Sequence, residues 1–118
     1  MYAMTESLIT YDDFTNVDLR VGRIVQVEDF PEARKPAWKL TIDFGPELGM
    51  RKSSAQIKDL YTKEALEGRL VIACVNLPPK KIGPMMSECL TCGVPDVQGR
   101  VVLLALEQQD IPLGVKVF

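Results

Sequence analysis

Two adjacent lysines in a proline-rich segment are the residues of this chain best suited to binding a ligand. Lys80 and Lys81 follow the sequence Val75-Asn76-Leu77-Pro78-Pro79 and precede Gly83-Pro84. Each proline fixes φ at about −65° and removes a backbone donor, so the segment cannot be a helix interior and is partly ordered before binding. A rigid loop loses less entropy when it binds. The segment therefore predicts a recognition loop rather than a catalytic one.

Hydroxyl and amide side chains gather in a second segment, Ser53-Ser54-Ala55-Gln56. It lies where an expected strand ends and an expected helix begins, so Ser and Gln there can cap the helix. The same groups can bond to phosphate and ribose if the fold brings them beside Lys80 and Lys81. The sequence leaves both interpretations open.

The chain contains no histidine, which removes the usual general base and the commonest metal ligand. A Ser-His or Cys-His nucleophile pair is therefore excluded. Neither of the two common glycine-rich phosphate loops occurs in the sequence. The adjacent acids Asp12-Asp13 and Glu28-Asp29 are expected to be solvated rather than catalytic. We expect a binding protein without a cofactor, not an enzyme.

The three cysteines are expected to be reduced and to bind no metal. Cys89 and Cys92 have C-x-x-C spacing, but a structural zinc site needs four ligands and only Cys74 remains. Residues three apart on a strand also point to opposite faces, so packing in the core is the expected role. The first ten residues lack a basic region followed by an apolar stretch. Together with the odd number of cysteines, this favours a cytoplasmic protein.

The net charge of −2 conceals an uneven distribution. Basic residues outnumber acidic ones between Arg20 and Lys81, where they include Arg34-Lys35, Arg51-Lys52 and Lys80-Lys81, whereas the flanks are acidic. Because surface charges are screened beyond about 10 Å, the local potential governs binding of a polyanion more than the total does. No apolar run approaches the roughly 18 residues that cross a bilayer, so no membrane insertion is expected.

The elements that must position these side chains are mostly short strands. Gly22 lies inside the first strand and predicts a bulge or bend of the kind that small barrels need. Three strands, a helix and two strands follow one another, which is the outline of the five-stranded oligonucleotide/oligosaccharide-binding (OB) barrel. We expect one all-β domain with a short helix over residues 1–118, with the barrel at 18–95 and extensions at 1–17 and 96–118. The expected strands are 18–30, 38–44, 50–55, 70–75, 88–92 and 101–106, with a capped helical turn at 10–14, a helix at 56–66 and a weaker strand at 111–117.

Three segments in this order resemble the tRNA-binding domain family, which comprises free-standing bacterial proteins and modules appended to aminoacyl-tRNA synthetases. They are Asp18-Leu19-Arg20-Val21-Gly22-Arg23-Ile24, Ser53-Ser54-Ala55-Gln56-Ile57 and Val75-Asn76-Leu77-Pro78-Pro79-Lys80-Lys81-Ile82. A branch of export-related chaperones within that family is the most similar, through Phe30-Pro31-Glu32-Ala33-Arg34, Ile42-Asp43-Phe44-Gly45 and Ser87-Glu88. The resemblance covers nearly the whole chain from Phe14 onward.

The resemblance implies an OB barrel whose terminal extensions build a homodimer. It implies affinity for the outside corner of tRNA and, for the chaperone branch, binding of unfolded or precursor polypeptides in protein export. We expect the chaperone function, with a free-standing tRNA-binding protein or an accessory synthetase module as the alternative. Met85, Met86 and Leu77 are expected to contact a polypeptide or to pack beneath the loop, and the apolar stretch 101–106 is expected to need a partner surface. By matching motif positions, the implied ligand contacts are Ser53, Ser54, Gln56, Asn76, Lys80, Lys81, Ser87 and Glu88.

Overall fold

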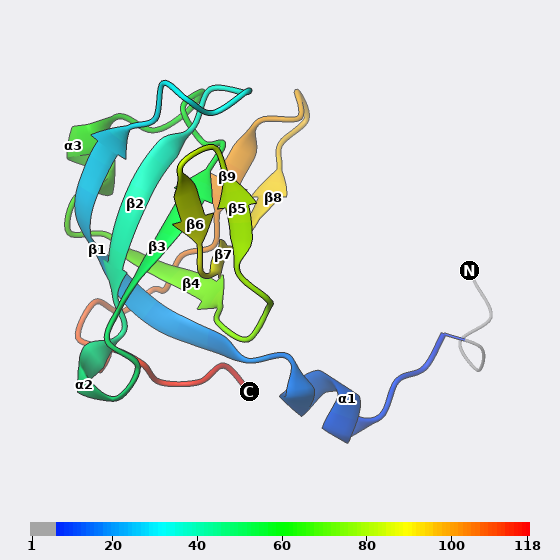
Figure 1. The fold of residues 1–118 in the computed structure, drawn as a ribbon. Coiled ribbons are helices and arrows are strands. Elements are labelled where there is room, and N and C mark those ends of the chain that lie inside the picture. Colours follow the sequence, from blue (N-terminus) through cyan, green and yellow to red (C-terminus); the bar gives the residue numbers. More distant parts are fainter. Residues whose placement is uncertain (1–6) are drawn as a thin grey trace.

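A computed structural model describes residues 7–118, so the first six residues of the expected N-terminal extension lie outside it. Strands dominate, and the helices are short (Figure 1). No helix in the described part of the chain has the length and apolarity to span a membrane. In chain order the elements are α1 (Tyr11–Asn16), β1 (Leu19–Asp29), β2 (Trp38–Asp43), α2 (Gly45–Leu48), β3 (Met50–Ala55), α3 (Lys63–Leu66), β4 (Leu70–Cys74), β5 (Lys80–Ile82), β6 (Met85–Ser87), β7 (Leu90–Thr91), β8 (Gly93–Pro95) and β9 (Val101–Leu103).

Five strands form an antiparallel sheet in the order β3-β2-β1-β4-β7, which curls into a nearly closed barrel (Figure 1). The long strand β1 serves both halves, because it pairs with β4 over residues 19–23 and with β2 over residues 23–29. At the crossing, a Cβ on Gly22 would lie 2.5 Å from Ile42 Cγ2 and 2.7 Å from Phe44 Cε1, so these two core side chains pack against the backbone of β1 only because residue 22 is glycine. The expected OB-type, mainly β architecture is confirmed.

The barrel closes between β3 and the segment 87–91 through few contacts. The backbone N–H of Glu88 donates to Lys52 O at 2.7 Å, and Lys52 N–H donates to Glu88 Oε1 at 3.0 Å. Ser54 N–H donates to Ser87 Oγ at 3.1 Å. Ser53 Oγ and Thr91 Oγ1 share a hydrogen bond of 3.0 Å. Side chains thus supply much of the hydrogen bonding that a continuous strand ladder would otherwise provide.

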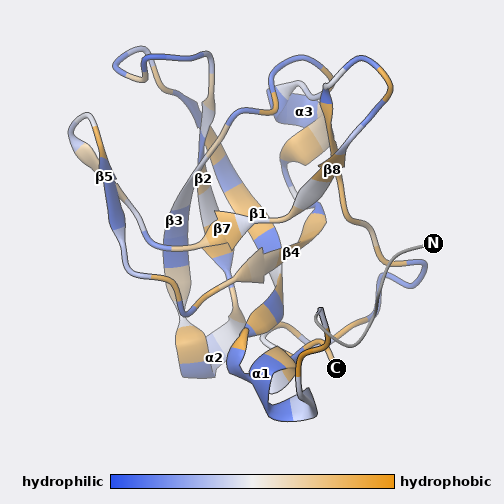
Figure 2. Ribbon diagram, turned by 90° about the vertical axis from the view of Figure 1, so that its right-hand side faces the viewer, coloured by the Kyte–Doolittle hydropathy of each residue, from blue (hydrophilic) through white to orange (hydrophobic). Residues whose placement is uncertain are grey.

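The core fills the barrel and also includes Leu103, from the expected C-terminal extension at 96–118. Leu103 of β9 is 4% exposed and packs in the main apolar cluster with Leu40, Ile42 and Phe44. Near the C-terminus, Gly114 N–H donates to Val21 O at 2.8 Å, on β1. The apolar stretch 101–106 is therefore partly covered by its own chain. Figure 2 shows the hydrophobic character of β4 and β7, in contrast with the hydrophilic start of β5.

The helix expected at 56–66 is wrong in extent, because only its last turn, α3, is helical. Trp38 Nε1 donates to Tyr61 O at 2.9 Å, and this carbonyl is the one that would accept from residue 65 in a longer helix. Ala65 N–H instead bonds to the side chain of Thr62, which caps α3. The expected turn at 10–14 is confirmed as α1, with Thr10 as its N-cap.

Replacing Thr91 with Val tests the closure, because it removes the partner of a hydroxyl that has no access to solvent. Ser53 is 0% exposed, so its unpaired Oγ should destabilise the fold by about 1–3 kcal/mol. Adding Ser53→Ala to Thr91→Val removes the orphaned group and should restore part of the loss. Urea unfolding measures both effects. Equal stability of the single and double variants would show that this hydrogen bond does not support closure.

Candidate nucleic-acid interface

The proline-rich segment, expected to be a loop, contains a hairpin of β5 and β6 that presents the two lysines. Lys80 pairs with Ser87, Lys81 with Met86 and Ile82 with Met85. The two-residue connection begins with Gly83 at φ +57°, a conformation that hairpin turns give to glycine. The register places Lys80 beside the barrel closure, because Ser87 bonds to β3.

A small apolar cluster joins the hairpin to the loop 31–37. Phe30, Ala37 and Met85 are buried together, with Ala33 and Ile82 packed against them. At the hairpin tip, a Cβ on Gly83 would lie 3.4 Å from Glu32 Cβ of the loop. The cluster therefore holds the loop and the hairpin in a fixed relation. Of the two roles expected for Met85, packing beneath the hairpin is the one observed, because its side chain is 6% exposed.

A groove of about 680 Å³ lies between the loop 31–37 and the hairpin, and its cations come from both walls. Arg34 and Lys35 project from the loop, and Lys80 and Lys81 from β5. All four residues are exposed. The groove is lined by Glu32, Ala33, Arg34, Lys35, Ala37, Ser54, Gln56, Lys80, Lys81, Ile82 and Gly83.

A second hollow of about 320 Å³ adjoins the groove and is lined by larger apolar side chains, among them Leu77 and Leu90. Both cavities are lined by Ser54, Gln56, Lys80 and Ile82. The hollow adds apolar side chains from the approach to β5 and from β7, together with two of the expected contact residues. These added residues are Leu77, Pro78, Ser87, Glu88, Cys89 and Leu90.

The structure brings six of the eight expected contact residues to these two cavities: Ser54, Gln56, Lys80, Lys81, Ser87 and Glu88. Ser53 does not reach the surface, because it alternates with Ser54 on β3 and points into the barrel, where its hydroxyl meets Thr91. Asn76 has a different role. Its Oδ1 accepts from Asp18 N–H at 3.0 Å, and its Nδ2 donates to Asn16 O at 2.7 Å.

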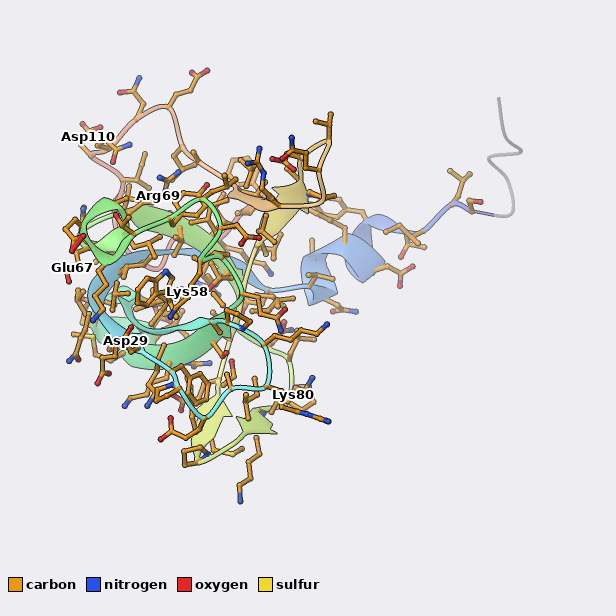
Figure 3. The ribbon with its side chains drawn as sticks, turned by 90° about the horizontal axis from the view of Figure 1, so that it is seen from above. Asp29, Lys58, Glu67, Arg69, Lys80 and Asp110 are labelled. Atoms are coloured by element: carbon orange, nitrogen blue, oxygen red, sulfur yellow. The ribbon has the colours of Figure 1, made fainter. Side chains whose placement is uncertain are left out.

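The cations of the groove have no carboxylate partner among residues 7–118, where the ion pairs involve Asp18, Asp29 and Asp96. Elsewhere Lys63 and Lys58 pair with Asp29 and, chiefly through the hydrogen bond and charge of Lys63, hold the pKa of that carboxyl below its usual range. Figure 3 shows Lys80 pointing outward, on the side of the barrel away from Glu67 and Asp110. The positive charge of the groove is therefore available to an external anion.

Arg34 and Lys35 line the groove, but the sequence analysis did not assign them as ligand contacts. The sequence did contain a signal for them. Pro31 and Pro36 flank this basic pair, much as two prolines precede the basic pair at 80–81. What the sequence did not reveal is that the loop packs against the hairpin. That contact is made by apolar residues distant in the chain, Phe30 and Met85.

The C-x-x-C residues lie near the hollow without forming a reactive pair. Burial raises the pKa of the Cys89 thiol to about 11, so it stays protonated at neutral pH. Burial also raises the pKa of Cys92. Within the portion of the chain that the structure covers, no group of three or more His, Cys, Asp and Glu side chains could hold a metal ion.

The fold closely matches two solved chaperone structures. One is the CsaA chaperone protein from Picrophilus torridus, at 45% identity and a TM-score of 0.87, with 94% of this chain and 100% of that chain covered. The other is the chaperone CsaA from Bacillus anthracis, at 46% identity and a TM-score of 0.85, with 94% and 99% covered. The expected similarity to the export-related chaperones is thus confirmed at the level of structure.

Methionine–tRNA ligases are curated relatives of the chain. That of Pyrococcus abyssi is 36% identical over 112 residues, which are 95% of this chain and 15% of the ligase. The chain therefore spans only a small part of these enzymes. A family model described as "Putative tRNA binding domain" matches residues 19–116. This match takes in the whole barrel, both walls of the groove and the strand pairing near the C-terminus, and the chain accordingly belongs to the tRNA-binding domain family.

Proposed function

We propose that the chain binds tRNA through the groove between the loop 31–37 and the β5–β6 hairpin. The observation that carries this proposal is the convergence of four cations, Arg34, Lys35, Lys80 and Lys81, on one cavity without a carboxylate partner in residues 7–118. Neutralising phosphates releases counterions and supplies much of the affinity for a nucleic acid. The family match supports tRNA as the nucleic acid.

The lining of the groove favours recognition of the RNA backbone and shape over reading of bases. None of its lining residues within the described chain is aromatic, so the groove offers no platform for stacking an unpaired base. Ser54 and Gln56 supply a hydroxyl and an amide that can bond to phosphate or to a ribose 2′-OH. We therefore propose a cytoplasmic location. In the alternative function, as an accessory module of an aminoacyl-tRNA synthetase, the same groove would hold tRNA for a separate catalytic domain.

Replacing Lys80 and Lys81 with Ala tests this proposal. Each lysine that contacts a phosphate should account for about 1 unit of the slope of log affinity against log salt, so the slope should become shallower by about 2. Filter binding of a tRNA transcript between low and moderate salt measures the slope. The control is Lys63→Ala with Lys116→Ala, which removes the same charge outside the groove. A wild-type slope for Lys80→Ala/Lys81→Ala would refute binding at the groove.

A second candidate function is the binding of unfolded or precursor polypeptides in protein export. Two observations favour it: the likeness to the CsaA chaperones and the apolar hollow beside the groove. Leu77 and Leu90 line this hollow and are 48% and 54% exposed. An extended chain lying there would place apolar side chains against them while its backbone met polar groups such as Ser87.

Replacing Leu77 and Leu90 with Ser should reduce suppression of aggregation of a chemically unfolded client, because apolar contact area is lost. Light scattering of the client at stoichiometric excess of the protein measures the effect. Both side chains are about half exposed, so the fold should tolerate the changes. Undiminished suppression by this variant would exclude the hollow as the polypeptide site, and absence of suppression by the unchanged protein would exclude the chaperone function.

We further propose a homodimer built with the terminal extensions, and exposed apolar side chains near the N-terminus support it. Leu8, Ile9 and Tyr11 are 65%, 68% and 72% exposed. This segment and α1 project from the barrel (Figure 1). A free arm of this kind gains stability by burying its apolar side chains on another surface.

Multi-angle light scattering at micromolar concentration should give twice the mass of the chain. Replacing Leu8, Ile9 and Tyr11 with Ser should shift the mass towards that of one chain, because the arm would lose its apolar contacts. A single-chain mass for the unchanged protein would contradict the dimer.

A further inference from the structure

The β5–β6 hairpin has another hollow on its other flank. This hollow of about 330 Å³ is lined by Lys39 of β2, Lys52 of β3, the hairpin residues Pro84, Met85 and Met86, and Glu88. The groove with Lys80 and Lys81 lies on the flank that faces the loop 31–37. The hairpin is therefore a ridge between two hollows, and Figure 2 shows it projecting beside β3.

Both flanks of this ridge carry unpaired positive charge. Lys39 Nζ lies 5.1 Å from the centre of the Phe30 ring, and Lys52 is exposed. Neither lysine takes part in an ion pair within residues 7–118. The one carboxylate in this hollow belongs to Glu88, whose Oε1 accepts Lys52 N–H at 3.0 Å and so is held at the barrel closure.

The ridge is rigid and its tip carries no charge. Met85 is fixed in the small cluster with Phe30, and Ser87 Oγ accepts a hydrogen bond from β3. Gly83 and Pro84 at the tip are exposed. A preformed ridge of this kind meets a ligand with little loss of conformational entropy.

We propose that the hairpin inserts between two phosphate backbones of a folded RNA, with Lys80 and Lys81 on one backbone and Lys39 and Lys52 on the other. The inference rests on the proposed tRNA-binding function and specifies its ligand as paired, folded RNA rather than a single strand. A single backbone running along the groove leaves the cations of the opposite flank without a phosphate. The shallow minor groove of an RNA helix is wide and displays 2′-hydroxyl groups, which an uncharged tip can approach.

The test compares two ligands, a folded tRNA transcript and an oligouridylate of the same length, for two double variants. Lys39→Gln/Lys52→Gln removes both charges while keeping polar side chains with part of the aliphatic stem, although it also removes the contact of Lys39 Nζ with the Phe30 ring. It should make the salt slope for tRNA shallower by about 1 for each lysine, and leave oligouridylate binding nearly unchanged. Lys80→Gln/Lys81→Gln should weaken the binding of both ligands.

The matched control is Lys63→Gln/Lys116→Gln, whose charges lie outside both hollows.

The outcomes separate this inference from the function on which it rests. Wild-type tRNA binding by Lys39→Gln/Lys52→Gln, with loss in Lys80→Gln/Lys81→Gln, would overturn the two-backbone arrangement while the groove remained a tRNA site. Equal weakening of tRNA and oligouridylate by Lys39→Gln/Lys52→Gln would also overturn it, because one strand would then contact both flanks. Wild-type binding by Lys80→Gln/Lys81→Gln would refute the proposed function itself.

Discussion

The contact between β3 and the segment 87–91 determines both the closure of the barrel and the position of the candidate binding surface. Lys52 and Glu88 exchange two hydrogen bonds there, and Ser87 Oγ accepts from Ser54 N–H. Ser87 is also the last residue of β6, so the bond that closes the barrel fixes the base of the hairpin. Several polar residues that the motifs indicated as ligand contacts therefore also hold the barrel closed. Ser53 shows this most plainly, because its hydroxyl is wholly buried against Thr91.

Local ion pairing, rather than the net charge of −2, determines where positive charge is available on this molecule. Asp29 and Asp96 bind lysine or arginine from their own neighbourhoods, and these cations are largely neutralised. The lysines on the hairpin and beneath it have no such partner within residues 7–118. Screening over about 10 Å then separates the basic surface from acids on distant faces. An acidic protein can therefore present a basic site.

Local patterning predicted the first three strands well and failed where distant residues decide the backbone. β2 alternates apolar and polar side chains, and glycine and proline mark the turn before β3, so the bounds of both strands were nearly right. The helix at 56–66 was overextended because Trp38, far away in sequence, bonds to Tyr61 O. The hairpin was missed because prolines obscured two very short strands.

For the site, motif positions singled out the lysines of β5, which line the groove, but did not separate Ser53 from Ser54, although strand alternation held that information. Arg34 and Lys35 were recognised as a basic pair, yet only packing against Met85 places their loop beside the hairpin. Residue type thus indicated the chemistry, and tertiary contacts decided its location.

The two proposed ligands cannot occupy their cavities independently. Groove and apolar hollow share Ser54, Gln56, Lys80 and Ile82, so an RNA in the first and a polypeptide in the second would meet at the same side chains. Their driving forces differ, because phosphate contacts weaken as salt rises whereas burial of apolar surface does not depend on ion release. If both ligands bind, they compete, and higher ionic strength shifts the competition towards the polypeptide. The same rigid hairpin then contributes to both sites. Its lysines face the RNA, and Leu77, in the segment that leads into β5, faces the polypeptide.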